Sequence, residues 1–71
     1  MLIRLPDDVD IEVPIEVMTI KDSIFVPTLK PVETRALLRA IAKDINIKLA
    51  FATLVVDGYL GVQFWRVDRR K

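Results

Sequence analysis

The dipeptide Asp57–Gly58 is the feature that most constrains the fold, because it stands between two long apolar runs. Asp-Gly in that setting is typical of a two-residue β-hairpin turn, in which both residues adopt positive φ angles. The flanking runs, 47–56 and 59–67, therefore predict two antiparallel strands. A two-residue turn also fixes the register, so that Val56 is expected opposite Tyr59 and every further pair follows.

The register sorts the side chains of this hairpin between two faces. The face expected to support a helix is almost entirely apolar: Leu49, Phe51, Thr53, Val55, Leu60, Val62 and Phe64. The opposite face mixes aromatic, small and polar residues: Lys48, Ala50, Ala52, Leu54, Val56, Tyr59, Gly61, Gln63 and Trp65. Because this second face is also largely apolar, we expect the N-terminal hairpin or a second subunit to cover it. The alternative is that Tyr59 and Trp65 stack against unpaired bases.

Residues 31–46 have the periodicity of an amphipathic helix, with Pro31 in the first turn, where its missing N–H costs nothing. A separate stripe, the basic ridge, holds Arg35, Arg39 and Lys43 at intervals of four residues, and the helix offers them no acidic neighbours. We expect this ridge to project into solvent. The stripe expected to pack on the sheet is mostly apolar: Thr34, Leu37, Leu38, Ile41, Ala42 and Ile45.

Three strands are expected before the helix. Residues 2–5 end at Pro6, and residues 23–27 end at Pro27. Residues 10–20 alternate between apolar and polar side chains, but Pro14 cannot donate a hydrogen bond, so this strand should lie at an edge or break there. The order β-β-β-α-β-β predicts an α+β fold, a small two-layer domain in which one α-helix packs on a twisted antiparallel β-sheet.

The chain of 71 residues is expected to form a single domain, 1–71, with an acidic β-hairpin arm at 1–22, a β-α-β-β core at 23–68 and a basic tail at 69–71. A chain this short usually needs a disulfide, a metal or a partner chain for stability. The sequence has no cysteine and no histidine, and its apolar fraction is 52%. These properties favour a homo-oligomer, such as a dimer.

The same absences argue against an enzyme. No histidine is present to act as a general base, and nothing activates the hydroxyls of Ser23 and Thr28. The sequence has no glycine-rich phosphate loop, so no cofactor is predicted. The spacing of Asp7, Asp8 and Asp10 is compatible with a cation site, but the loop and the distal glutamate of such sites are missing. No metal is therefore expected, and a solvated turn is the simpler interpretation.

Charge is divided unevenly along the chain. Residues 1–30 carry three basic and six acidic side chains, a net charge of −3, whereas residues 31–71 carry eight and four, a net charge of +4. The division suggests an anionic partner for the second half. The acidic residues from Asp7 to Glu16 could instead dock a basic protein surface.

The first residues, MLIRLPDD, turn acidic at once and lack the pattern of a signal peptide. No run of about 18 apolar residues occurs, so neither a membrane span nor a membrane partner is expected. Together with the absence of cysteine, these features favour a cytoplasmic location.

The basic residues of the second half make DNA or RNA the leading expected partner. Cationic side chains neutralise phosphates and release counterions, which produces salt-sensitive binding. The alternative is that the ridge is only a solvated helix face. The candidate nucleic-acid-binding residues are Arg35, Arg39, Lys43, Lys48, Tyr59, Trp65, Arg66, Arg69 and Arg70.

Two segments, SIFVPT at 23–28 and GVQFWRV at 61–67, resemble small, mostly uncharacterised proteins of tailed bacteriophages. The resemblance covers residues 23–68 and does not include the acidic N-terminal segment. It implies an accessory phage product that acts in the cytoplasm of the host bacterium. Such products commonly bind nucleic acid or disable a host protein. The leading hypothesis is therefore a non-enzymatic nucleic-acid-binding protein, and the alternative is a protein–protein interaction module that inhibits or modulates a host factor.

Overall fold

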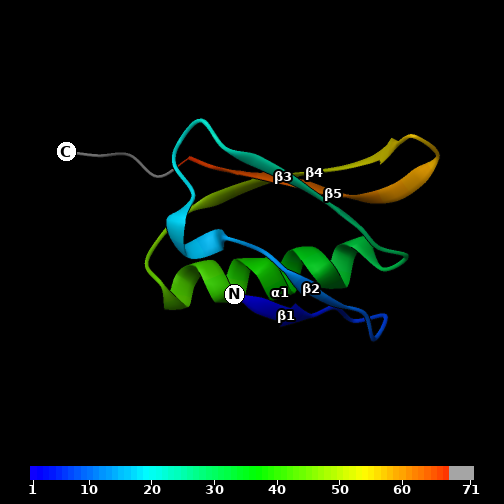
Figure 1. Ribbon diagram of the computed structural model, residues 1–71, viewed down its shortest axis with the longest axis horizontal. Helices are drawn as coiled ribbons and strands as arrows, with labels where there is room; N and C mark the ends of the chain where they lie inside the picture. Colours follow the sequence, from blue (N-terminus) through cyan, green and yellow to red (C-terminus); the bar gives the residue numbers. More distant parts are fainter. Residues whose placement is uncertain (68–71) are drawn as a thin grey trace.

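The computed structural model describes residues 1–67 and shows a small α+β domain with two layers, which confirms the fold class (Figure 1). The predicted tail residues Arg69 and Arg70 lie outside the described residues. In chain order the elements are β1 (Leu2–Arg4), β2 (Asp10–Glu12), the 3-10 turn η1 (Ile15–Val17), β3 (Ser23–Pro27), α1 (Pro31–Asp44), β4 (Leu49–Val56) and β5 (Tyr59–Arg66).

The main sheet has three antiparallel strands in the order β3-β5-β4. The turn between β4 and β5 has φ angles of 52° at Asp57 and 83° at Gly58, as a two-residue hairpin turn requires. Val56 pairs with Tyr59 and Phe51 with Phe64, so the register expected from the turn is confirmed. The pairing of β3 with the far side of β5 leaves β4 at the edge of the sheet.

Helix α1 lies along one face of this sheet, which we call the inner face (Figure 1). Its buried residues are Thr34, Leu38 and Ala42, which belong to the stripe expected to pack inward. Leu38 meets Val26 and Phe64 of the sheet in the hydrophobic core. The helix ends where Asn46 adopts a left-handed φ of 65°, a conformation that asparagine tolerates better than most residues.

The N-terminal segment departs from the expected single sheet. Within the described residues, strands β1 and β2 pair only with each other and form a separate two-stranded sheet. The strand expected over 10–20 ends at Glu12, and η1 replaces its second half after Pro14. Proline has no N–H to continue a ladder, so the break falls where the sequence allowed for one.

The small β1–β2 hairpin packs into the core and does not project as an arm. Ile3, Leu5, Val13 and Ile15 are all buried in the cluster that contains Leu38 and Phe64. Figure 1 shows the hairpin and α1 on the same side of the main sheet. The expectation that this hairpin covers the opposite, outer face is therefore wrong, and no element within residues 1–67 covers that face.

Candidate functional site

Strand β4 has an unprotected outer edge. Within residues 1–67 it pairs on one side only, with β5. Its eight residues, LAFATLVV, include no charge and no proline, and the register with β5 continues without a bulge. None of the eight is fully buried, whereas Gly61, Val62 and Phe64 of β5 are. Natural sheets usually protect an edge with charges, proline or a bulge, so this strand is exposed to pairing with another chain.

The register identifies the backbone groups at this edge. In a two-residue hairpin the pair that flanks the turn exchanges hydrogen bonds, and alternate pairs along the ladder repeat that arrangement. Val56 flanks the turn, so the backbone groups of Val56, Leu54, Ala52 and Ala50 face β5. The N–H and C=O groups that face outward are those of the alternate residues: Leu49, Phe51, Thr53 and Val55.

The basic ridge lies directly beside this edge. The guanidinium carbons of Arg35 and Arg39 are 5.7 and 5.1 Å from the centre of the Phe51 ring. Arg35 Nη1 also donates a hydrogen bond of 3.3 Å to Thr53 Oγ1. Cation–π contacts of this kind hold guanidinium groups over an aromatic face without neutralising them. Lys43 continues the ridge one turn further along α1, and it is exposed like Arg39.

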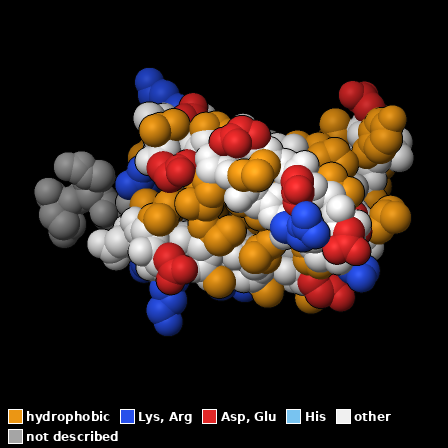
Figure 2. All heavy atoms as spheres, turned by 60° about the horizontal axis from the view of Figure 1, so that its bottom comes forward, with side chains coloured by type: hydrophobic (Ala, Val, Ile, Leu, Met, Phe, Trp, Pro, Cys, Tyr) orange, Lys and Arg blue, Asp and Glu red, His pale blue; other side chains and the backbone are white. Residues whose placement is uncertain are grey.

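Three acidic side chains of the first half, Asp10, Glu12 and Glu16, form ion pairs within that half. Asp10 Oδ1 accepts from Arg4 Nε at 2.9 Å, and the Met1 ammonium contacts Glu12 Oε2 at 2.6 Å and Glu16 Oε1 at 3.3 Å. Among residues 1–67 no carboxylate forms an ion pair with the ridge. Figure 2 shows acidic side chains scattered among hydrophobic ones on the side away from the sheet.

These N-terminal contacts shift three pKa values. The hydrogen bond to Glu12 raises the pKa of the Met1 ammonium, and the hydrogen bond to Asp10 raises the pKa of Arg4. A hydrogen bond from its own backbone, followed by one from the Met1 ammonium, lowers the pKa of Glu16 below its ordinary value. All three shifts arise from contacts within the N-terminal segment.

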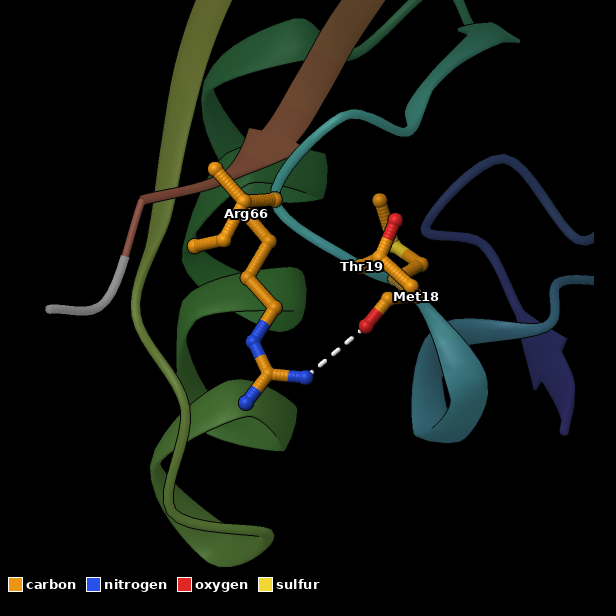
Figure 3. A pocket seen from close by; sticks show the side chains of 4 residues that line it. Met18, Thr19 and Arg66 are labelled. Atoms are coloured by element: carbon orange, nitrogen blue, oxygen red, sulfur yellow. Dashed lines mark hydrogen bonds between the residues drawn. The ribbon is translucent and has the colours of Figure 1, made fainter. Parts of the chain in front are cut away.

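Arg66 occupies a different place from the one predicted. Its Nη1 donates a hydrogen bond of 2.8 Å to the carbonyl oxygen of Met18 (Figure 3). With Thr19 and Ile20 these two residues line an open pocket of about 350 Å³. The guanidinium thus points across the inner side toward the N-terminal segment, and it links β5 to the loop after η1.

The aromatic residues of the candidate set lie on the outer face. Trp65 is half-buried and Tyr59 is 65% exposed, and they stand near opposite ends of β5. Phe25 of β3 joins them there, because it pairs with Gln63 and its ring lies against Gly61. Sequence reasoning missed Phe25. Alternation places its side chain on the other side of the strand from Ile24 and Val26, but it does not reveal which strand β3 pairs with.

The candidate nucleic-acid-binding residues are thus distributed over two faces. Arg35 and Arg39 lie beside Phe51 of β4, and Lys43 follows one turn further along α1. Tyr59 and Trp65 lie on the outer face, and Lys48 is exposed just before β4. The structure therefore brings the ridge together with an edge strand, a combination that the sequence did not indicate.

No group of three or more metal-ligating side chains occurs in the described part of the chain. In the acidic turn, Asp7 Oδ2 accepts a hydrogen bond of 3.3 Å from the N–H of Leu29, and Asp10 is paired with Arg4. Between residues 1 and 67, α1 is neither long nor apolar enough to cross a bilayer. Comparisons with family models, with curated protein sequences and with solved structures find no match to this chain.

Proposed function

We propose that this protein is a non-enzymatic protein-binding module that adds an extended segment of a partner to the free edge of β4. The observation that carries the proposal is the eight-residue edge strand without charge, proline or bulge. Addition of a strand to such an edge is a recurring mode of peptide recognition, in which main-chain hydrogen bonds supply affinity.

The other edge of the same sheet supports the choice of β4. Strand β3 has five residues, ends in Pro27 and follows the charged pair Lys21 and Asp22. Short length, proline and adjacent charge are the usual means of discouraging strand addition. Only β4 offers four outward-facing residues in an uninterrupted register.

A peptide library tests the proposal through amide hydrogen exchange. Extended peptides that bind are expected to slow exchange of the outward amides of Phe51, Thr53 and Val55. Exchange of the amides at the free edge of β3 should not change. Thr53→Pro removes one outward N–H and is expected to abolish binding with little loss of folding, because proline is tolerated on an edge strand. A library without any binder, or with protection confined to other elements, would refute the proposal.

Nucleic-acid binding remains a second candidate. It is favoured by Arg39 and Lys43, which are exposed, whereas Arg35 is half-buried against Phe51 and Thr53. It predicts salt-sensitive binding of labelled DNA or RNA that is lost in the double variant Arg35→Glu, Arg39→Glu. Trp65→Ala reports separately on the outer face. If affinity and salt dependence are unchanged in the double variant, the ridge does not bind phosphates.

The phage resemblance suggests where either activity operates. An accessory phage protein in the host cytoplasm would bind and modulate a bacterial protein, or bind DNA or RNA. A homodimer is the further alternative, in which Leu54 and Trp65 of the outer face are buried between two copies. Sedimentation separates this case, since a strict monomer at micromolar concentration excludes it.

A further inference from the structure

The proposed strand addition has a consequence for the sequence of the partner, and the following inference rests on it. We infer that the segment taken up by β4 is acidic, with a carboxylate at every second residue facing Arg35, Arg39 and Lys43. The inference names the chemistry of the partner: an extended peptide of alternating acidic and apolar residues.

The ridge and the edge run side by side. Arg35 contacts Thr53 and the Phe51 ring, and Arg39 lies over the same ring. Figure 1 shows α1 aligned with the strands of the main sheet, and its chain direction is opposite to that of β4. Each further turn of the helix therefore brings the next basic side chain toward an earlier residue of the strand.

The two spacings agree. Four residues of α-helix rise about 6 Å, and two residues of a β-strand advance about 6.6–6.8 Å. A strand added outside β4 would therefore present alternate side chains at nearly the interval that separates Arg35, Arg39 and Lys43. Residues in that strand directly opposite Phe51 or Thr53 point to the same face as those side chains, which is the face covered by the ridge.

The remaining residues of the added strand would point to the outer face. There the nearest residues of β4 are Ala50, Ala52 and Leu54, which are small or apolar and half-buried. No acidic side chain lies on this part of the sheet, since the strands carry none. The two faces thus favour carboxylates on one side of the added strand and apolar side chains on the other.

Charge argues against a second copy at the same edge. Antiparallel pairing of two β4 strands about a twofold axis would place residues of one ridge opposite those of the other, because an isologous contact joins the same surface to itself. The guanidinium groups of both copies would then meet beside the shared edge without a carboxylate. An acidic strand removes this repulsion and adds charge-assisted hydrogen bonds.

The test uses fluorescein-labelled peptides in which aspartate alternates with valine, and isomers in which the same aspartates form one block. The alternating peptide is expected to bind at least about tenfold more tightly than the block isomer, because only alternation directs every carboxylate to the ridge. Its affinity should fall with added salt. Amide exchange should show protection of Phe51, Thr53 and Val55.

Matched variants assign the effect to the ridge. Arg35→Ala with Arg39→Ala is expected to weaken binding by at least about tenfold, whereas Arg4→Ala with Lys21→Ala removes the same charge elsewhere and should have little effect. Arg39→Glu, at an exposed position, should reverse the preference toward a peptide with lysine in place of aspartate. Thermal melts confirm that each variant remains folded.

The outcomes separate this inference from the proposed function. Equal binding of both isomers with protection of β4 would overturn the acidic pattern and leave strand addition standing. Unchanged affinity in the Arg35 and Arg39 double variant would likewise overturn the acidic pattern and leave strand addition standing. If no peptide protects β4, both proposals fail. The inference of an acidic partner segment would also be overturned by a dimer paired through β4, or by a nucleic acid that binds the ridge alone.

Discussion

Phe64 and Trp65 are neighbours in β5, yet they belong to opposite environments. The Phe64 side chain points to the inner face and has no exposed surface, whereas Trp65 points to the outer face and is half-buried. Both follow from the alternation of side chains along a strand. The chain supplies a cover for one face, made of α1 and the β1–β2 hairpin, and none for the other within residues 1–67.

The difference teaches that apolar sequence alone does not locate the core. Phe25, Leu54 and Tyr59 on the outer face are as apolar or aromatic as many core residues, but they do not enter the buried cluster. A face and an edge that the chain leaves open are surfaces available to a partner. The following predictions test how different the two faces are, from the largest expected effect to the smallest.

Phe64→Ala should be the most damaging change. It removes a ring at 0% exposure from the centre of the core, and such truncations cost about 3–5 kcal/mol. Trp65→Ala, its matched control, should cost less than half as much because that side chain is already partly solvated. Urea unfolding monitored by circular dichroism measures both, and equal losses would contradict the contrast between the faces.

Gly61→Ala should show that the outer face is also closely packed at one point. A methyl group there would meet the Val26 carbonyl oxygen and would lie 2.6 Å from Phe25 Cζ. Backbone cannot move aside as a flexible side chain can, so we expect a loss of about 1–3 kcal/mol. Gly58→Ala cannot serve as the control, because the positive φ of Gly58 would strain an alanine there. Ala52→Gly is the comparison variant, since it removes a methyl group from the outer face where Gly61→Ala adds one. An unfolding midpoint unchanged by Gly61→Ala would contradict the close approach.

Thr34→Val probes the polar contact on the covered side. The Oγ1 atoms of Thr28 and Thr34 are 3.1 Å apart, and both residues are buried. Loss of this hydrogen bond should cost about 1 kcal/mol. Thr28→Val should cost more, because Thr28 Oγ1 also accepts a hydrogen bond from the N–H of Lys30. The reverse order in chemical denaturation would show that this account of the pair is wrong.

Glu16→Gln should have the smallest effect, and the effect should depend on pH. The pKa of Glu16 is lowered in the folded protein, so its carboxylate contributes stability above the ordinary value of 4.5, and the contribution is lost as the pH falls through the folded pKa. The variant should therefore be less stable at neutral pH and equal to the parent in strong acid. A difference that persists in acid would contradict this, and added salt should reduce the neutral-pH effect.

Local sequence predicted much of the fold but only half of the candidate site. The turn at Asp57–Gly58 set the β4–β5 register, and helical periodicity placed the basic ridge on one side of α1 and Leu38 on the other. The position of β3 could not be predicted, because its pairing joins residues far apart in sequence. For the same reason the edge position of β4 and the contact of Arg66 with Met18 were missed.

The sequence by itself determined the elements whose signals are local: the turn, the alternation of β5, the stripes of α1 and the break at Pro14. Tertiary structure alone decided which side of the sheet the N-terminal hairpin covers and which strand is left at the edge. The physical reason is that several apolar surfaces compete for a core too small to bury them all. Only packing of the whole chain selects the surface that stays open, and here that surface lies beside Arg35 and Arg39.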